Sequence, residues 1–171
     1  LTGMRIGEVC ALRWRDICLD TGEIRVRATM QRLQKLEPVD GKRTEIVVGE
    51  AKSYASCRTI PLTGTALQLC GKMRMGDPNA FVLTARADRF MEPRALQYRL
   101  KKYTKACGIS DIHFHTLRHT FATRCVEVDF EVKSLSEILG HASAKVTLDR
   151  YVHSSIELKR KNMKKLAAAG L

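Results

Sequence analysis

The chain has 171 residues, which is the size of one domain. Thirty Lys and Arg against 18 Asp and Glu give a net charge of +12, which is typical of nucleic-acid-binding proteins, although basic proteins also bind anionic membranes or acidic proteins. No apolar run approaches the ~20 residues that cross a bilayer, and an aromatic content of 6% disfavours a single-strand binder that stacks bases.

The sequence opens on polar residues without the apolar stretch of a signal peptide, and on Leu rather than Met. We therefore expect a piece of a longer, intracellular chain. The cysteines are scattered and form no Cys-x-x-Cys pair, so a zinc ribbon is disfavoured and reduced thiols are expected. They are Cys10, Cys18, Cys57, Cys70, Cys107 and Cys125.

The N-terminal residues predict a short helix, Thr2–Leu12, with Thr2 as its N-cap. Arg5 and Glu8 lie three residues apart in it. Such a pair is either a surface ion pair or an arrangement in which Glu8 holds Arg5 in place for a ligand.

Alternating apolar and polar residues over Glu23–Gln31 predict a half-buried strand. A loop at Glu37–Lys42 leads to a second strand, Thr44–Val48, and a turn at residues 49–55 leads to a third, Ser56–Leu62. That turn carries Lys52, and a lysine in such a turn is usually solvated.

Two helices are predicted in the middle of the chain, Thr63–Met73 and Pro93–Cys107, with a short extended piece at Phe81–Leu83 between them. Pro93 suits the first turn of the second helix, and Gly108 suits its end. The basic residues of this helix form either a solvated face or a face toward a DNA backbone; they are Arg94, Arg99, Lys101, Lys102 and Lys105.

The stretch His113–Tyr151 concentrates side chains that can do chemistry. A helix is predicted over Thr116–Val128 with a buried stripe made of Leu117, Phe121, Cys125 and Val128. His115 and Arg118 then share a neighbouring face, where two converging donors suit an anionic oxygen. The alternative is a structural histidine beside a surface arginine.

A capping box at residues 134–137 predicts a helix that begins near Leu135 and ends at Gly140, immediately before His141. A further short helix, Ala144–Arg150, delivers Tyr151. A second capping box, at residues 154–157, predicts a basic amphipathic helix over Ile156–Ala169.

In combination, these motifs resemble the catalytic domain of the tyrosine recombinase (phage integrase) family, and the resemblance covers nearly the whole chain. The matching boxes are Leu1-Thr-Gly-Met-Arg5-Ile-Gly-Glu8 with Leu12-x-Trp14-x-Asp16-Ile17, Lys52-Ser-x-x-Ser56-x-Arg58-Thr-Ile-Pro61-Leu62, His115-Thr-Leu-Arg118-His119, Leu139-Gly140-His141-Ala-Ser143, and Thr147-x-x-x-Tyr151-x-His153.

The resemblance implies a mixed α+β fold, mostly helical with a small antiparallel sheet or hairpin. Residues 1–171 would form the catalytic domain, with residues 154–171 as a C-terminal helical tail. In relatives a further helix and an N-terminal DNA-binding domain precede the first arginine box. Both are absent from these 171 residues, so we expect weaker DNA binding than by a chain that carries them.

The implied function is that of a site-specific recombinase or integrase, which cleaves and rejoins DNA through a 3′-phosphotyrosine without metal, ATP or another cofactor. Tyr151 is the expected nucleophile, and Arg5 and Arg118 are the expected donors to the phosphate oxygens. His141 is the expected third donor, and His115 is the expected proton acceptor for the tyrosine. Lys52 is the expected acid for the leaving 5′ oxygen. Glu8 and His119 are the expected supporting residues.

The same resemblance implies double-stranded DNA carrying a recombination site as partner, bound by a homotetramer, whereas the isolated domain would be monomeric. It also implies a bacterial or mobile-element protein of the cytoplasm and nucleoid, with no membrane association. The C-terminal tail is expected to dock on a neighbouring subunit, and docking on its own domain is the alternative.

Three other interpretations stay open. One is a type IB topoisomerase-like enzyme that relaxes DNA, and another is a DNA-binding module without catalysis. The third is a zinc site at His115-x-x-x-His119, which is disfavoured because no third ligand follows at a typical spacing.

Overall fold

The computed structural model describes residues 2–39, 42–50, 56–74, 76–151 and 156–168. In chain order the elements are α1 (Ile6–Ala11), the 3-10 turn η1 (Trp14–Asp16), β1 (Ile17–Cys18), β2 (Glu23–Val26), β3 (Ala28–Val39), β4 (Lys42–Glu50), β5 (Arg58–Pro61), α2 (Gly64–Met73), α3 (Pro93–Ala106), α4 (Phe114–Glu127), α5 (Val132–Leu139), α6 (Ala144–Tyr151) and α7 (Ile156–Ala168). The predicted α+β fold, mostly helical with small antiparallel sheets, is confirmed.

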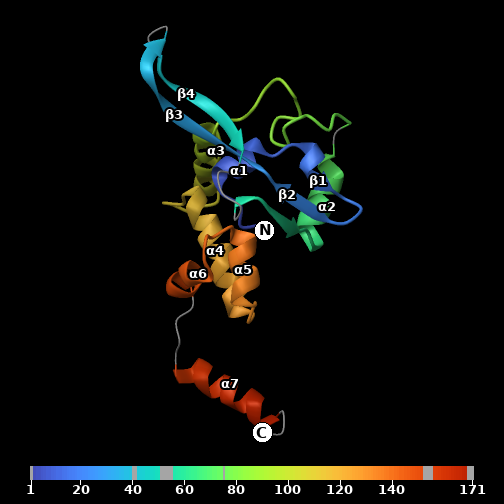
Figure 1. Ribbon diagram of the computed structural model, residues 1–171, viewed down its shortest axis with the longest axis vertical. Helices are drawn as coiled ribbons and strands as arrows, with labels where there is room; N and C mark the ends of the chain where they lie inside the picture. Colours follow the sequence, from blue (N-terminus) through green and yellow to red (C-terminus); the bar gives the residue numbers. More distant parts are fainter. Residues whose placement is uncertain (1, 40–41, 51–55, 75, 152–155, 169–171) are drawn as a thin grey trace.

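The strands form two antiparallel sheets. One has the order β1-β2-β5, with Ile24 opposite Ile60, and the other is the long ribbon β3–β4, which projects from the body of the molecule (Figure 1). The prediction of a single strand over Glu23–Gln31 is wrong, because the chain leaves the first sheet after Val26 and enters the ribbon at Ala28. Alternation continues across this change of partner, so a period of two cannot reveal it.

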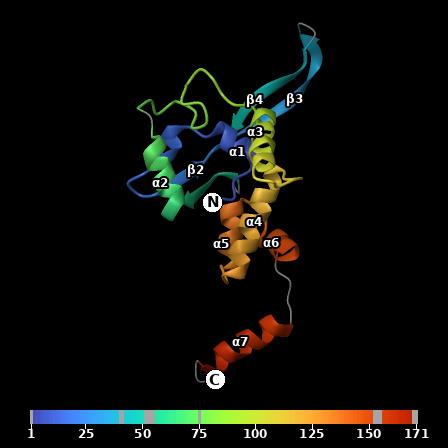
Figure 2. The ribbon, with the colours of Figure 1, turned by 180° about the vertical axis from the view of Figure 1, so that it is seen from behind.

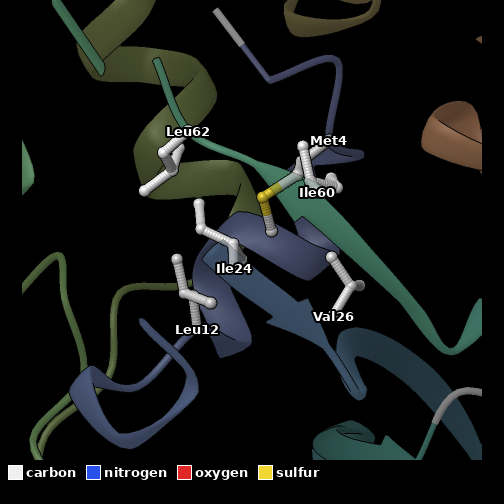
Figure 3. Packing of buried hydrophobic residues seen from close by; sticks show 6 residues of the cluster. All are labelled: Met4, Leu12, Ile24, Val26, Ile60 and Leu62. Carbon is white, nitrogen blue, oxygen red and sulfur yellow. The ribbon is translucent and has the colours of Figure 1, made fainter. Parts of the chain in front are cut away.

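The larger core lies between the three-stranded sheet and α1. Ile24, Val26 and Ile60 of the strands pack against Met4, Leu12 and Leu62 (Figure 3). Helix α2 covers this cluster with Leu67 and Cys70, and Ile138 of α5 reaches it from the other half of the molecule. Burial of each such aliphatic side chain contributes about 1.5–3 kcal/mol relative to exposure.

A second cluster holds the helical half together. Ala122 and Cys125 of α4 pack against Leu135 and Leu139 of α5, and Tyr151 of α6 packs against the same group. The N-terminal segment lies between this helical half and the sheet, as Figures 1 and 2 show from opposite sides. Residues at the start of the chain can therefore contact the ends of α4 and α5.

Three predicted helix starts are wrong. Helix α1 begins at Ile6 and not at Thr2, because Gly3 has a left-handed backbone (φ +63°) and the Arg5 main-chain N–H is 2.7 Å from Glu8 Oε2. Helix α5 begins at Val132, since Glu131 accepts from the N–H groups of Lys133 and Ser134. Helix α4 begins at Phe114, two residues before the predicted start.

The predicted buried stripe of α4 is right at Cys125, and Phe121 packs against the same cluster, but it is wrong at Leu117 and Val128. Leu117 and Val128 are 44% and 73% exposed, whereas Arg118 is only 3% exposed and shares the buried face with Ala122 and Cys125. The stripe is rotated because a buried arginine takes the place of an apolar residue. The predicted α3, with Pro93 in its first turn, and the predicted end of α5 at Gly140 are confirmed.

Candidate active site

Glu8 lies buried at the start of α1 between two arginines. Its Oε1 is 3.0 Å from Arg5 Nη1, and Arg58 of β5 forms a fork on it, with Nη1 3.0 Å from Oε1 and Nη2 2.8 Å from Oε2. Burial alone would raise the pKa of this carboxyl, but the hydrogen bonds and charge of Arg58, together with the bonds from Arg5, lower it. Glu8 is therefore an anion that holds Arg5, as the second sequence interpretation expects.

Arg118 is held by main-chain carbonyl groups. Its Nη1 donates to Gly3 O and its Nη2 to Leu139 O, both at 2.7 Å. Burial lowers the pKa of Arg118 to about 10, so the group keeps its charge at neutral pH. A Cβ at Gly3 would lie 2.6 Å from the Phe121 ring, so only glycine allows the chain to approach α4 this closely.

Arg5 and Arg118 both bind carbonyl groups of the turn that ends α5. Arg5 Nη2 is 2.9 Å from Gly140 O, next to the Leu139 carbonyl that accepts from Arg118. Gly140 has φ +64°, the left-handed conformation that ends a helix and redirects the chain. Arg5 and Arg118 thus lie side by side, although 112 residues separate them in the sequence.

His141 follows this turn and is oriented by α6. Its Nδ1 is 2.8 Å from the hydroxyl oxygen of the buried Thr147. Burial and then the charges of Arg118 and Arg5 lower the pKa of His141 to about 4. The ring is therefore neutral at pH 7 and faces a hollow of about 540 Å³ between β5 and α5, which Arg58 and Glu137 also line.

Tyr151 ends α6 beside the histidines of α4. The His119 ring contacts both of the other rings, with its centroid 4.3 Å from that of His115 and 5.5 Å from that of Tyr151. The Tyr151 hydroxyl is buried and has no hydrogen-bond partner within the described part of the chain. Burial, followed by the charges of His119 and Arg118, lowers the pKa of His115, which favours the neutral ring.

The structure thus brings together seven of the eight residues singled out in the sequence: Arg5, Glu8, His115, Arg118, His119, His141 and Tyr151. The eighth, Lys52, lies outside the described residues. Two residues of the same boxes received no role from the sequence, Arg58 and Thr147. Only their positions could have identified them from the sequence, since each lies in a box that also holds a candidate catalytic residue.

No group of three His, Cys, Asp or Glu side chains that could hold a metal ion occurs among the residues that the structure describes. His115 and His119 meet edge to face, at 89° between their ring planes. Across the same ranges, no helix is long and apolar enough to span a bilayer.

Comparisons with known proteins bear on this site. The model of the phage integrase family matches residues 1–157. Tyrosine recombinase XerC of Xanthomonas axonopodis pv. citri is 31% identical, over 89% of this chain and 43% of the relative, and the integrase of Staphylococcus phage L54a is 27% identical, over 97% and 49%. The chain spans about half the length of these curated relatives.

Solved structures give the same result. The Tn1549 transposon integrase, determined in complex with transposon right end DNA, superimposes with a TM-score of 0.74 at 26% identity, over 97% of this chain and 55% of that one. The XerA recombinase, at 21% identity and a TM-score of 0.64, shares the fold. The chain therefore belongs to the phage integrase family of tyrosine recombinases.

Proposed function

We propose that this chain is the catalytic part of a site-specific DNA recombinase or integrase, which cleaves and rejoins DNA through a 3′-phosphotyrosine. The observation that carries the proposal is the pairing of Arg5 and Arg118 on adjacent carbonyls, directly before His141, with Tyr151 packed beside the helix that bears Arg118. Two fixed guanidinium groups beside a phenol suit phosphoryl transfer, and the family membership supports that reaction.

In the proposed reaction the Tyr151 oxygen attacks the phosphorus atom, and the 5′ oxygen of the next nucleotide leaves. Negative charge then grows on the non-bridging phosphate oxygens, where Arg5 and Arg118 provide planar, permanently charged donors. The guanidinium groups of Arg5 and Arg118 each use two N–H groups in the bonds to the protein, and their remaining N–H groups can donate to phosphate oxygens. Because the new ester keeps the energy of the broken one, a 5′ hydroxyl can reverse the step without ATP.

The proton leaves the phenol as the new bond forms. His115, neutral because its pKa is lowered, is the proposed acceptor, and His119, whose ring contacts both His115 and Tyr151, is the proposed supporting residue. His141 would donate its Nε2 hydrogen to a phosphate oxygen when the Thr147 hydroxyl donates to Nδ1. Lys52 is the proposed acid for the leaving oxygen.

The proposed partner is double-stranded DNA that carries a recombination site, bound by four copies of the chain. The excess of 12 positive charges supports DNA binding, as does the solved complex of the similar Tn1549 integrase with transposon DNA. Strand exchange between two duplexes requires several active sites at once, which is the chemical reason for proposing an assembly.

A nicked duplex that traps the covalent product tests the function. Incubation should give a denaturant-resistant protein–DNA adduct, which Tyr151→Phe abolishes while DNA binding remains; Tyr98→Phe, at a 73% exposed side chain, is the control. The adduct should also form in excess EDTA. An adduct that persists in Tyr151→Phe would refute the assignment, and a product of relaxed circles without exchanged strands would favour a topoisomerase.

A further inference from the structure

Three consecutive carbonyl groups at the end of α5 each accept a hydrogen bond from a different arginine. Arg58 Nε is 2.5 Å from Ile138 O, Arg118 Nη2 is 2.7 Å from Leu139 O, and Arg5 Nη2 is 2.9 Å from Gly140 O. The last carbonyls of a helix have no partner within it and carry the negative end of its dipole, so they favour cations. These three carbonyls are called the arginine cradle below.

Arg58 differs in its contacts from Arg5 and Arg118, the other two arginines that bind the cradle. Its side chain is 5% exposed, against 42% for Arg5, and its two Nη groups take one oxygen each of Glu8. Arg58 also donates to Ser56 O, 3.3 Å away, in the segment just before β5. It therefore joins β5, α1 and α5 through one guanidinium group.

The charges around Glu8 explain what this contact does. One carboxylate faces two guanidinium groups, and the fork from Arg58 uses both of its oxygens. Arg5 is left with one side-chain bond to Glu8, on Oε1, and one to Gly140 O. Without Arg58, Glu8 could rotate to pair with both Nη groups of Arg5, which would draw Arg5 off the cradle and neutralise its charge.

We propose that Arg58 is a positioning residue for Arg5: by neutralising Glu8 and fixing it against the end of α5, it keeps the Arg5 guanidinium on the cradle and its charge available to a phosphate. This inference rests on the proposed function only in taking the ligand of Arg5 to be a phosphate of DNA. The position of Arg5 can be measured without DNA.

The first test is nuclear magnetic resonance of the free protein, on the Arg5 guanidinium signals identified by their loss in Arg5→Lys. Bonds from Nη1 to Glu8 and from Nη2 to Gly140 hinder rotation, so the two Nη groups should give separate signals in the wild-type chain. Arg58→Lys keeps the charge but cannot fork two oxygens. It should merge or shift these signals.

The matched control is Arg86→Lys. Arg86 also forms a fork, with Nε 2.9 Å from Asp88 Oδ1 and Nη2 2.8 Å from Asp88 Oδ2, but this pair lies exposed in the loop between α2 and α3. It should leave the Arg5 signals and adduct formation unchanged. If Arg58→Lys fails to fold, Arg58→Met with Glu8→Gln removes both charges together and is measured in the same way.

The second test is the rate of adduct formation on two substrates. On a normal phosphodiester, Arg58→Lys should be slower by roughly 10–100-fold, the effect of displacing a reacting group by about 1 Å. On a substrate with a methylphosphonate at the scissile position, which lacks one anionic oxygen, the deficit should largely disappear. A purely structural role of Arg58 would give the same deficit on both substrates.

The outcomes separate the two proposals. Unchanged Arg5 signals in Arg58→Lys overturn the positioning role, and so does an equal deficit on both substrates. If the wild-type chain forms no adduct while Arg58→Lys still shifts the Arg5 signals, the proposed function fails and the positioning of Arg5 by Arg58 stands.

Discussion

Replacing Arg118 by Met should destabilise the fold as well as stop the chemistry. Arg118 is 3% exposed and donates to two carbonyls, Gly3 O and Leu139 O. Met fills a similar volume but offers no donor, so both carbonyls lose a partner, at a cost of about 1–3 kcal/mol each. The burial of a guanidinium is relieved at the same time, which offsets part of this loss.

We expect a net loss of about 2–4 kcal/mol in the free energy of unfolding, since the offset is partial. For a chain of this size that corresponds to a melting temperature lower by roughly 4–16 °C. The measurement is thermal and urea unfolding followed by circular dichroism at pH 7. Arg118→Lys, which keeps N–H donors but lacks the planar fork that reaches both carbonyls in the wild type, should fall between the wild type and Arg118→Met.

Arg124→Met is the control on the same helix. Its side chain is 77% exposed, and its ion pair with Glu127 at 2.8 Å contributes about 0–1 kcal/mol. If Arg118→Met melts within a degree or two of Arg124→Met, the bonds to Gly3 and Leu139 do not hold the N-terminal segment against the helical half, and the geometry of the site described above is wrong.

Two further predictions follow from charge. The pKa of His141 in the folded chain, about 4, lies below the usual ~6.5, so between pH 4 and 6.5 the unfolded chain binds more protons than the folded one. The contribution of the neutral His141 to the free energy of unfolding, up to about 3 kcal/mol, is therefore complete above pH 6.5 and is lost as the pH falls toward 4. His141→Asn should therefore flatten the pH dependence of urea unfolding between pH 4 and 6.5, and an unchanged slope would contradict this. For DNA binding, log affinity should fall with log salt by about 0.9 per neutralised phosphate, and Lys102→Ala on α3 should lower that slope by about one if α3 faces the backbone; titrations at several salt concentrations decide this.

The sequence predicts those parts of the fold that depend on local signals. The end of α5 at Gly140 and the start of α3 at Pro93 are each determined within one turn, by a left-handed glycine and by a proline without an N–H group. A helix start is harder to predict where two local signals compete. Glu131 and Ser134 can both cap a helix, and only the structure shows that Glu131 accepts the bonds while Ser134 lies inside α5.

The contacts that assemble the site depend on distant residues, and the sequence does not predict them. Periodicity places Arg118 on a face beside the predicted buried stripe, because a pattern of apolar residues cannot show that two carbonyls compensate a buried guanidinium. Arg5, Arg58 and Arg118 meet at the arginine cradle from three different elements. Resemblance to a family identifies which side chains matter, but it does not say which carbonyl holds each of them.

The last prediction concerns α7. In both views this helix stands apart from α4, α5 and α6 (Figures 1 and 2), and two of its apolar side chains, Met163 and Leu166, are 63% and 44% exposed. Lys165 Nζ lies 3.2 Å from Asp129 Oδ2, an exposed ion pair that contributes about 0–1 kcal/mol. Contacts of this kind are too weak to make α7 part of the domain's own core, so its apolar side needs another partner surface.

We expect that surface to belong to a neighbouring copy in the DNA-bound assembly, because α7 follows Tyr151 closely and its docking would then couple the nucleophile to assembly. A chain that ends after Ser155 should stay folded and lose less than about 4 °C in melting temperature, but it should bind DNA without cooperativity in gel-shift titrations. Lys165→Ala is the control and should bind cooperatively, since it removes the ion pair and keeps the apolar side. A truncated chain that unfolds, or that loses ten degrees or more, would place α7 on its own domain and would refute docking between copies.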